Sequence, residues 1–301
     1  MSELNVLLVA GTHGNEINAP WLMRKWKQNP GVLDTYGINT CFIEGNPGAL
    51  ENSKRYIDRD LNRSFSKKLL KSSLIKEKEV LRAEELLSLY GDRGVTPCQI
   101  AIDLHSTTSN MGSSLVVYGR RPADLAIASL IQAKLGILVY LHEGDNSQTG
   151  FLVESWPCGL VVEIGPVAQS LLDYRIVKQT HLVVQAFFEE ISKVKSGQVL
   201  FPDRLVIHKH LGSLDYPRDA QGMPKACLHP NIMNYNWRPI SNGQPLFIDL
   251  DGSVISYDGD NLNIPVFINE AAYAEKGIAL SLTRKEILDF SDDWEIDLKN
   301  L

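Results

Sequence analysis

Short apolar runs that alternate with helical patterns constrain the fold of this chain most strongly. Within residues 1–195 several runs are apolar almost throughout, as in strands buried on both faces of a parallel sheet. The predicted strands cover 5–10, 39–45, 99–105, 114–119, 137–142 and 160–165, and the predicted helices cover 74–90, 122–136 and 170–194. Such alternation predicts an α/β domain with a mostly parallel sheet flanked by helices.

The pattern changes after residue 195. Short β-like runs, among them 205–211, 244–250 and 252–257, are separated by turns rich in proline, glycine and asparagine. We therefore expect two domains, a larger one over 1–195 and a smaller β-rich one over 196–301.

Composition excludes several classes of protein. The net charge of −6 argues against a nucleic-acid-binding protein, which normally has a basic face. No run approaches the roughly 20 apolar residues of a membrane-spanning helix, and the first residues lack the basic region of a signal peptide. The cysteines contain no CxxC pair, so a cysteine zinc site is excluded, and each is expected to be a small buried residue: Cys41, Cys98, Cys158 and Cys227. We expect a cytoplasmic protein.

Two predicted strands end in residues that suit a metal ion. GTHGNE follows the first strand and holds His13 and Glu16, and the strand over 99–105 ends at His105. Ligands gather at the carboxyl ends of strands in open α/β sheets. Two imidazoles and one carboxylate leave the fourth position of a catalytic zinc open for water. The sequence therefore predicts one zinc ion on these three residues.

Less specific interpretations of these residues exist. In the alternative interpretation, His13 bonds only a backbone carbonyl and Glu16 only begins a helix, where a carboxylate suits the helix dipole. The metal site is favoured because two further strand ends carry His105 and Glu163. Asp103 lies two residues before His105, on the same face of a strand. It could orient the imidazole or equally serve as a local cap.

Glu163 lies inside the apolar run over 160–165. A lone buried carboxylate is costly, and proteins keep one mainly where it is paired, metal-bound or catalytic. Beside a zinc-bound water it would act as the general base. The alternative is an ion pair with a core arginine.

The segment KRYIDRDLNRSF, residues 54–65, is dense in charge and lacks a helical apolar period. Arg55, Asn62 and Arg63 could bind a small anionic substrate or stabilise a developing oxyanion. A charged loop alone is more often a solvated surface, and the predicted metal site makes the binding role preferable.

The motifs GTHGNE, RYIDRDLNR, IDLHSTTSNMG, VEIGP and VFINEAAY together resemble the succinylglutamate desuccinylase/aspartoacylase family of zinc amidohydrolases. The resemblance implies a carboxypeptidase-like catalytic domain, followed by a β-rich domain that restricts access to the site. It implies zinc on His13, Glu16 and His105 and assigns Glu163 as the base. It further implies that Arg55 polarises the scissile carbonyl and that Asn62, Arg63 and Tyr273 contact the substrate.

One stretch departs from the family pattern. Aspartoacylases carry a further substrate-binding arginine, and a tyrosine slightly before it, ahead of the VEIGP motif. Residues 145–159 contain neither, so one carboxylate partner of N-acetylaspartate is missing there. Ser106 stands where some members have asparagine.

These features together predict a zinc-dependent amidohydrolase that converts N-acetyl-L-aspartate and water to acetate and L-aspartate. One alternative is deacylation of another N-acyl amino acid, such as an N-acetyl aromatic residue or N-succinylglutamate. A metallocarboxypeptidase is less favoured, because the second domain would restrict the mouth of the site. The non-enzymatic alternative is a sensor that binds carboxylates. Members of the family that the chain resembles often self-associate, so a homo-oligomer is a further expectation.

Overall fold

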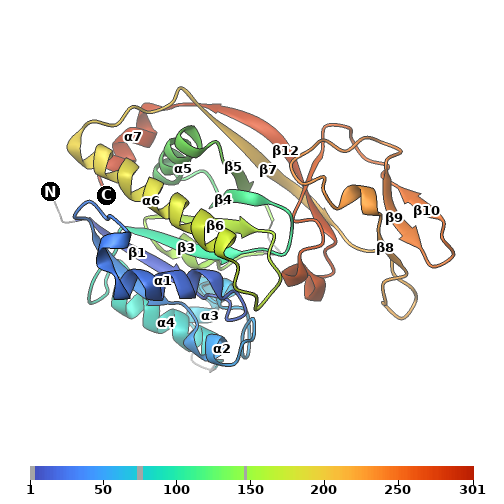
Figure 1. The fold of residues 1–301 in the computed structure, drawn as a ribbon, viewed down its shortest axis with the longest axis horizontal. Helices are drawn as coiled ribbons and strands as arrows, with labels where there is room; N and C mark the ends of the chain where they lie inside the picture. Colours follow the sequence, from blue (N-terminus) through green and yellow to red (C-terminus); the bar gives the residue numbers. More distant parts are fainter. Residues whose placement is uncertain (1–3, 73–76, 146–147) are drawn as a thin grey trace.

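The computed structural model describes residues 4–72, 77–145 and 148–301, and a nine-stranded sheet forms its centre (Figure 1). The strand order is β11-β12-β7-β5-β4-β6-β3-β1-β2. The parallel pairs are β1–β2, β1–β3, β3–β6, β4–β5 and β5–β7, and the remaining pairs of this sheet are antiparallel. The strands cover β1 Asn5–Ala10, β2 Asn39–Glu44, β3 Ile100–Ser106, β4 Gly112–Tyr118, β5 Leu138–His142, β6 Cys158–Gly165, β7 Arg204–Leu214, β11 Ile264–Val266 and β12 Leu280–Asp289.

Helices cover both faces of the sheet because its strands carry apolar side chains on both faces. In β1, Val6 and Leu8 belong to the cluster on one face, and Leu7 and Val9 belong to the cluster on the other. The first face packs against α1 Asn18–Gln28, α5 Pro122–Leu135, α6 Tyr174–Ser196 and α7 Asp292–Lys299. The second packs against α4 Lys78–Tyr90 and the segment around the 3₁₀ helices η2 Leu61–Arg63 and η3 Leu152–Ser155. The short helices α2 Pro47–Glu51, α3 Lys67–Leu70 and η1 Pro30–Val32 complete this part.

A small antiparallel sheet forms a separate lobe beyond the ends of β7 and β12 (Figure 1). Its strand order is β10-β9-β8, and it has its own apolar core around Leu228, Phe247 and Tyr257. The elements of this lobe are β8 Ala226–Leu228, η4 Pro230–Ile232, β9 Pro245–Asp249 and β10 Val254–Ser256. The 3₁₀ helix η5 Ala271–Lys276 precedes β12, and its Tyr273 packs against the apolar cluster on the second face of the large sheet.

The predicted fold class is confirmed: a large, mostly parallel sheet with flanking helices is followed by a smaller β-rich part. The run over 205–211, expected in the β-rich part, instead pairs with β5 as part of β7 and extends the large sheet. β11 and β12 extend it further, and the domain boundary at residue 195 stays a prediction. Residues 74–76 of the predicted helix over 74–90 lie outside the described residues, and α4 begins at Lys78.

The prediction that every cysteine is buried is wrong for Cys227. It lies between Ala226 and Leu228 in β8, and side chains alternate along a strand, so it faces outward while its two neighbours face the core. Cys98 and Cys158 are buried, and Cys41 is half-buried. Among the helices of the described residues, none has the length and apolar character needed to cross a membrane.

Candidate active site

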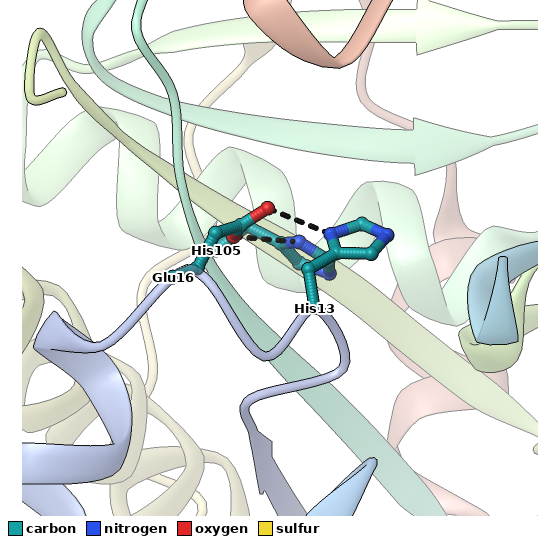
Figure 2. A group of neighbouring side chains, drawn as sticks. All are labelled: His13, Glu16 and His105. Atoms are coloured by element: carbon teal, nitrogen blue, oxygen red, sulfur yellow. Dashed lines mark hydrogen bonds and ion pairs between the residues drawn. The ribbon is translucent and has the colours of Figure 1, made fainter. Parts of the chain in front are cut away.

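The structure brings His13, Glu16 and His105 together at one edge of the large sheet (Figure 2). His13 and Glu16 lie in the loop between β1 and α1, and His105 lies near the end of β3. Because β1 and β3 are parallel neighbours, the two segments meet at the same edge. One potential ligand atom from each residue lies within 4.8 Å of the others, and all three side chains are buried.

Two glycines shape the loop that carries His13. Gly11 has a φ of +71°, in the left-handed region that side chains disfavour. A Cβ atom on Gly14 would lie 2.1 Å from the carbonyl carbon of Ala49, so only glycine fits. The N–H of Gly14 donates to the carbonyl of Arg55 at 3.3 Å, which holds the loop against the charged segment over 54–65.

Both imidazoles face carboxylates through both ring nitrogens. The Nδ1 atoms of His13 and His105 lie 2.7 and 3.2 Å from the two oxygens of Glu16 (Figure 2). The Nε2 atom of His13 lies 2.9 Å from Asp60, and that of His105 lies 2.7 Å from Asp103. Asp103 therefore lies where it can orient the His105 imidazole, which is one of the two roles predicted for it from the sequence. A carboxylate that accepts from one ring nitrogen fixes the tautomer and leaves the other nitrogen to bind a metal.

The charges around the imidazoles fit a cation. Burial alone would raise the pKa of the Glu16 carboxyl, but His13 and His105 outweigh it and hold that pKa well below its usual range. Burial alone would lower the pKa of His105, but Asp103 and Glu16 raise it well above the ordinary value. Three carboxylates thus stabilise positive charge here. Two imidazole nitrogens and one carboxylate oxygen match the ligands of a catalytic zinc site.

Glu163 lies on β6, next to His105 of β3 and Ser114 of β4 in the register of the sheet. Residues paired across neighbouring strands project to the same face, so its carboxylate lies on the side of the imidazoles. Burial raises the pKa of Glu163 to about 8, with His105 opposing and Glu16 adding to the shift. Glu163 lines the same pocket as the three candidate ligands. A carboxyl group with a raised pKa in such a pocket is suited to take up and release a proton during a reaction.

Arg55, Asn62 and Arg63 line this pocket as well. The Arg55 guanidinium lies 3.4 Å from Glu16 and 3.3 Å from Asp60, so it is not a solvated surface group. Its Nε atom and the Nε atom of Arg63 are buried and have no hydrogen-bond partner among the described residues. Unsatisfied guanidinium donors in a pocket suit an anionic ligand. Asn62 is fixed through its Oδ1 atom, which accepts from the N–H of Leu152 at 2.8 Å.

Tyr273 contributes to the pocket from the C-terminal part of the chain. It lies on η5, and its ring centroid is 5.5 Å from that of Phe267. Burial raises the pKa of the Tyr273 hydroxyl, which therefore stays protonated and able to donate. The pocket is thus lined by both parts of the chain.

The segment over 145–159 supplies an aromatic ring where a family arginine was expected. Phe151 lines the pocket and stacks on Tyr118 with a centroid distance of 3.9 Å. The guanidinium carbon of Arg63 lies 4.1 Å from the centre of the Phe151 ring, a cation–π contact. Phe151 therefore helps to position Arg63 instead of offering a second positive charge.

Several residues of the site were not identified from the sequence. Asp60 belongs to the segment over 54–65, but nothing there distinguishes it from Asp58, which accepts from the N–H of Lys78 in an exposed position. Tyr118 lies in an ordinary apolar strand and gave no signal. Glu270 immediately precedes the AAY of the VFINEAAY motif, which was a usable hint, and it lines the pocket.

Comparison with known proteins identifies the family of the chain. The catalytic-domain model of the succinylglutamate desuccinylase/aspartoacylase family matches residues 2–191, and the model of the family's barrel-sandwich hybrid domain matches residues 203–285. A protein of Prochlorococcus marinus (strain MIT 9313) described as "Probable aspartoacylase" is 58% identical over 301 residues, covering 100% of this chain and 99% of that protein.

Solved structures give the same result. Murine aminoacylase 3 superimposes with a TM-score of 0.87 at 31% identity, over 96% of this chain and 98% of that one. Succinylglutamate desuccinylase from Vibrio cholerae shares the fold, with a TM-score of 0.65 at 17% identity over 96% and 84% of the two chains. The chain belongs to the succinylglutamate desuccinylase/aspartoacylase family and is an amide hydrolase.

Proposed function

We propose that this protein is a zinc-dependent deacylase of small N-acyl amino acids, with N-acetyl-L-aspartate as its leading substrate. The observation that carries the proposal is that one pocket is lined by three residues able to ligate a metal ion, a carboxyl group with a raised pKa and two arginines. The products would be acetate and L-aspartate.

His13, Glu16 and His105 would hold the zinc ion, and Asp60 and Asp103 would orient the two imidazoles. A zinc ion bound there would supply Lewis acidity, which lowers the pKa of water and polarises a carbonyl group. Glu163 takes the proton of the attacking water and passes it to the leaving nitrogen, so that the amine departs in neutral form. Arg55 donates to the carbonyl oxygen as negative charge develops on it.

Arg63 binds the substrate's α-carboxylate, with Asn62 beside it and the Tyr273 hydroxyl as a further donor. The guanidinium of Arg63 is held in place before substrate arrives. Its Nη1 atom donates to the carbonyl of Asn62 at 2.7 Å, and its Nη2 atom donates to Gln148 at 2.9 Å. Such preorganisation lowers the entropic cost of binding.

A second candidate substrate is an N-acetyl aromatic amino acid. The pocket wall that includes Tyr118 and Phe151 also contains Tyr140 and Phe267. Aromatic surfaces of this kind favour an apolar side chain. N-succinylglutamate and a sensor that binds carboxylates without turnover are the remaining alternatives.

The test is amine release by the purified, zinc-loaded protein from N-acetyl-aspartate, N-acetyl-glutamate, N-succinyl-glutamate and N-acetyl-phenylalanine. We expect turnover that chelation abolishes and zinc restores. A Glu163→Ala variant should keep stoichiometric zinc and lose nearly all turnover, because Glu163 is not a ligand. Near-normal activity of this variant would refute its role as the base. Zinc binding without turnover of any substrate would favour the sensor. A cytoplasmic location and a homo-oligomer remain predictions.

A further inference from the structure

We propose that Lys276 binds the second carboxylate of a dicarboxylic substrate and so takes the place of the arginine that is absent from residues 145–159. Lys276 would then be a specificity-determining residue. The inference rests on the proposed function and identifies how the pocket distinguishes an acidic side chain from a neutral one.

The position of Lys276 is set by η5. Lys276 follows Tyr273 by three residues in this 3₁₀ helix, and a 3₁₀ helix has three residues per turn, so both side chains leave the same side. Tyr273 lines the catalytic pocket, whereas Lys276 lines the pocket next to it. Arg63 and Gln148 line both pockets. Lys276 therefore shares the lining of the adjoining pocket with Arg63, the arginine that also lines the catalytic pocket.

The ammonium has no carboxylate of its own. Across the described ranges 4–72, 77–145 and 148–301, no carboxylate oxygen lies within 4.0 Å of Lys276, although the side chain is half-buried. The nearby acids are occupied: Asp60 pairs with His13 and Arg55, and Glu275 accepts from the Tyr56 hydroxyl at 2.6 Å. A partly desolvated cation without a partner is a feature of ligand sites rather than of packing.

The electrostatic surroundings agree with this assignment. Burial lowers the pKa of Lys276 to about 8, with Arg63 and Arg55 adding to the effect and Asp60 and Glu275 opposing it. At pH 7 the lysine remains mostly charged. A substrate carboxylate would relieve both the desolvation and the repulsion from Arg63.

A substrate with two carboxylates can satisfy two cations at once. Arg63 would take the α-carboxylate and Lys276 the side-chain carboxylate. A neutral side chain would leave the ammonium desolvated and unpaired, which a site built for a charged group penalises strongly. The geometry thus favours N-acetyl-aspartate over its uncharged isostere, N-acetyl-asparagine.

Another lysine on the rim of the adjoining pocket offers a matched control. The Nζ atom of Lys209 lies 3.1 Å from Glu143, so this lysine already has a partner and lies outside the proposed binding set. A Lys209→Gln variant changes the charge of the rim without removing the proposed ligand group.

The experiment compares kcat/KM for N-acetyl-aspartate and N-acetyl-asparagine in the zinc-loaded wild type, Lys276→Gln, Lys276→Arg and Lys209→Gln proteins. In Lys276→Gln, kcat/KM for N-acetyl-aspartate divided by that for N-acetyl-asparagine should fall about 10- to 100-fold, because one charge-assisted hydrogen bond is lost. The fall should come mainly from a higher KM for N-acetyl-aspartate. Lys276→Arg should retain most of the ratio, and Lys209→Gln should retain all of it.

An unchanged ratio in Lys276→Gln would overturn the inference, as would a wild-type preference for N-acetyl-asparagine. If the wild type cleaves none of the substrates, the proposed function fails separately. Calorimetric titration with N-acetyl-aspartate then tests Lys276 directly. Equal affinities of wild type and Lys276→Gln would overturn the inference, and weaker binding by Lys276→Gln alone would support it.

Discussion

The carboxylate of Glu270 accepts a hydrogen bond from the backbone N–H of Thr108 at 2.8 Å, across 162 residues of sequence. The same oxygen also accepts from the hydroxyls of Thr107 and Thr108 and from the N–H of Ser109. Its other oxygen accepts from the N–H of Ala272 at the start of η5. Glu270 therefore joins the helix that carries Tyr273 to the turn that follows His105.

Replacing Glu270 with glutamine should lower kcat/KM about tenfold or more and reduce Tm by several degrees, with zinc content unchanged. The reason is that a neutral amide weakens the buried hydrogen bonds to Thr107, Thr108 and Ser109, each worth about 1.5–3 kcal/mol when the acceptor is charged. Steady-state kinetics, thermal unfolding and metal analysis check the three effects.

Glu275→Gln is the matched control for Glu270→Gln, because Glu275 lies in the same helix but accepts from the exposed Tyr56 hydroxyl. It should lose little stability or activity. Equal losses in the two variants would show that the turn after β3 does not depend on Glu270.

Replacing Asp103 with asparagine should weaken zinc binding about 10- to 100-fold, because the carboxylate no longer accepts from His105 Nε2. Asp103 is fully buried, and its second oxygen accepts from the Thr12 hydroxyl at 2.7 Å, so the side chain is held in one orientation. Competition with a chelator of known affinity measures the change.

Asp124 is an equally buried carboxylate on α5, where it pairs with Arg121 away from the candidate site. Asp124→Asn should therefore leave zinc affinity as it is, even where it reduces stability. If Asp103→Asn binds zinc like the wild type, Asp103 has no part in orienting His105.

Replacing Arg63 with alanine should raise KM for N-acetyl-aspartate about 10- to 100-fold and leave zinc content unaffected, since the variant loses the proposed partner of the α-carboxylate. Arg59→Ala is the control, because Arg59 belongs to the same charged segment but forms an ion pair with Glu77. An unchanged KM in Arg63→Ala would remove Arg63 from the substrate site.

Acid should destabilise the protein partly through His208. Burial lowers the pKa of His208 to about 4, from the ordinary value of 6.5. The unfolded chain therefore takes up a proton near pH 6.5, whereas the folded chain does not. The contribution of His208 to the free energy of unfolding is thus fully present above pH 6.5 and is lost as the pH falls towards 4. His208→Gln removes the titration, and its Tm should fall less between pH 7.5 and pH 5 than that of the wild type.

The wild type and His208→Gln share every other acid-sensitive group, including the candidate metal ligands, so the comparison isolates His208. Parallel Tm profiles for the two proteins over this pH range would contradict the assignment.

The sequence was most informative where backbone position alone determines placement. His13, Glu16 and His105 follow or end apolar runs, and parallel strands bring such ends to one edge of the sheet. The alternation of strands and helices predicted the large sheet for the same reason. These features depend on local periodicity, which a single sequence displays directly.

Features that depend on distant contacts were not predictable in this way. Asp58 and Asp60 have the same local surroundings in sequence, yet only Asp60 reaches an imidazole, because the direction of each side chain is set by the packing of the whole loop. The placement of β7 beside β5 was missed for a related reason. Its alternation of polar and apolar residues suits the outer strand of a small sheet as well as the margin of a large one.

The path of β7 and β12 has a consequence for dissection of the protein. A fragment that ends at residue 195 would lack β7, β11, β12 and α7, so the backbone of β5 would form an open edge of the sheet and part of α5 would lose its cover. Exposed edges of this kind promote association with other chains. A fragment of residues 1–195 is therefore not a complete folding unit, because the strands that close its sheet come from the last hundred residues of the chain.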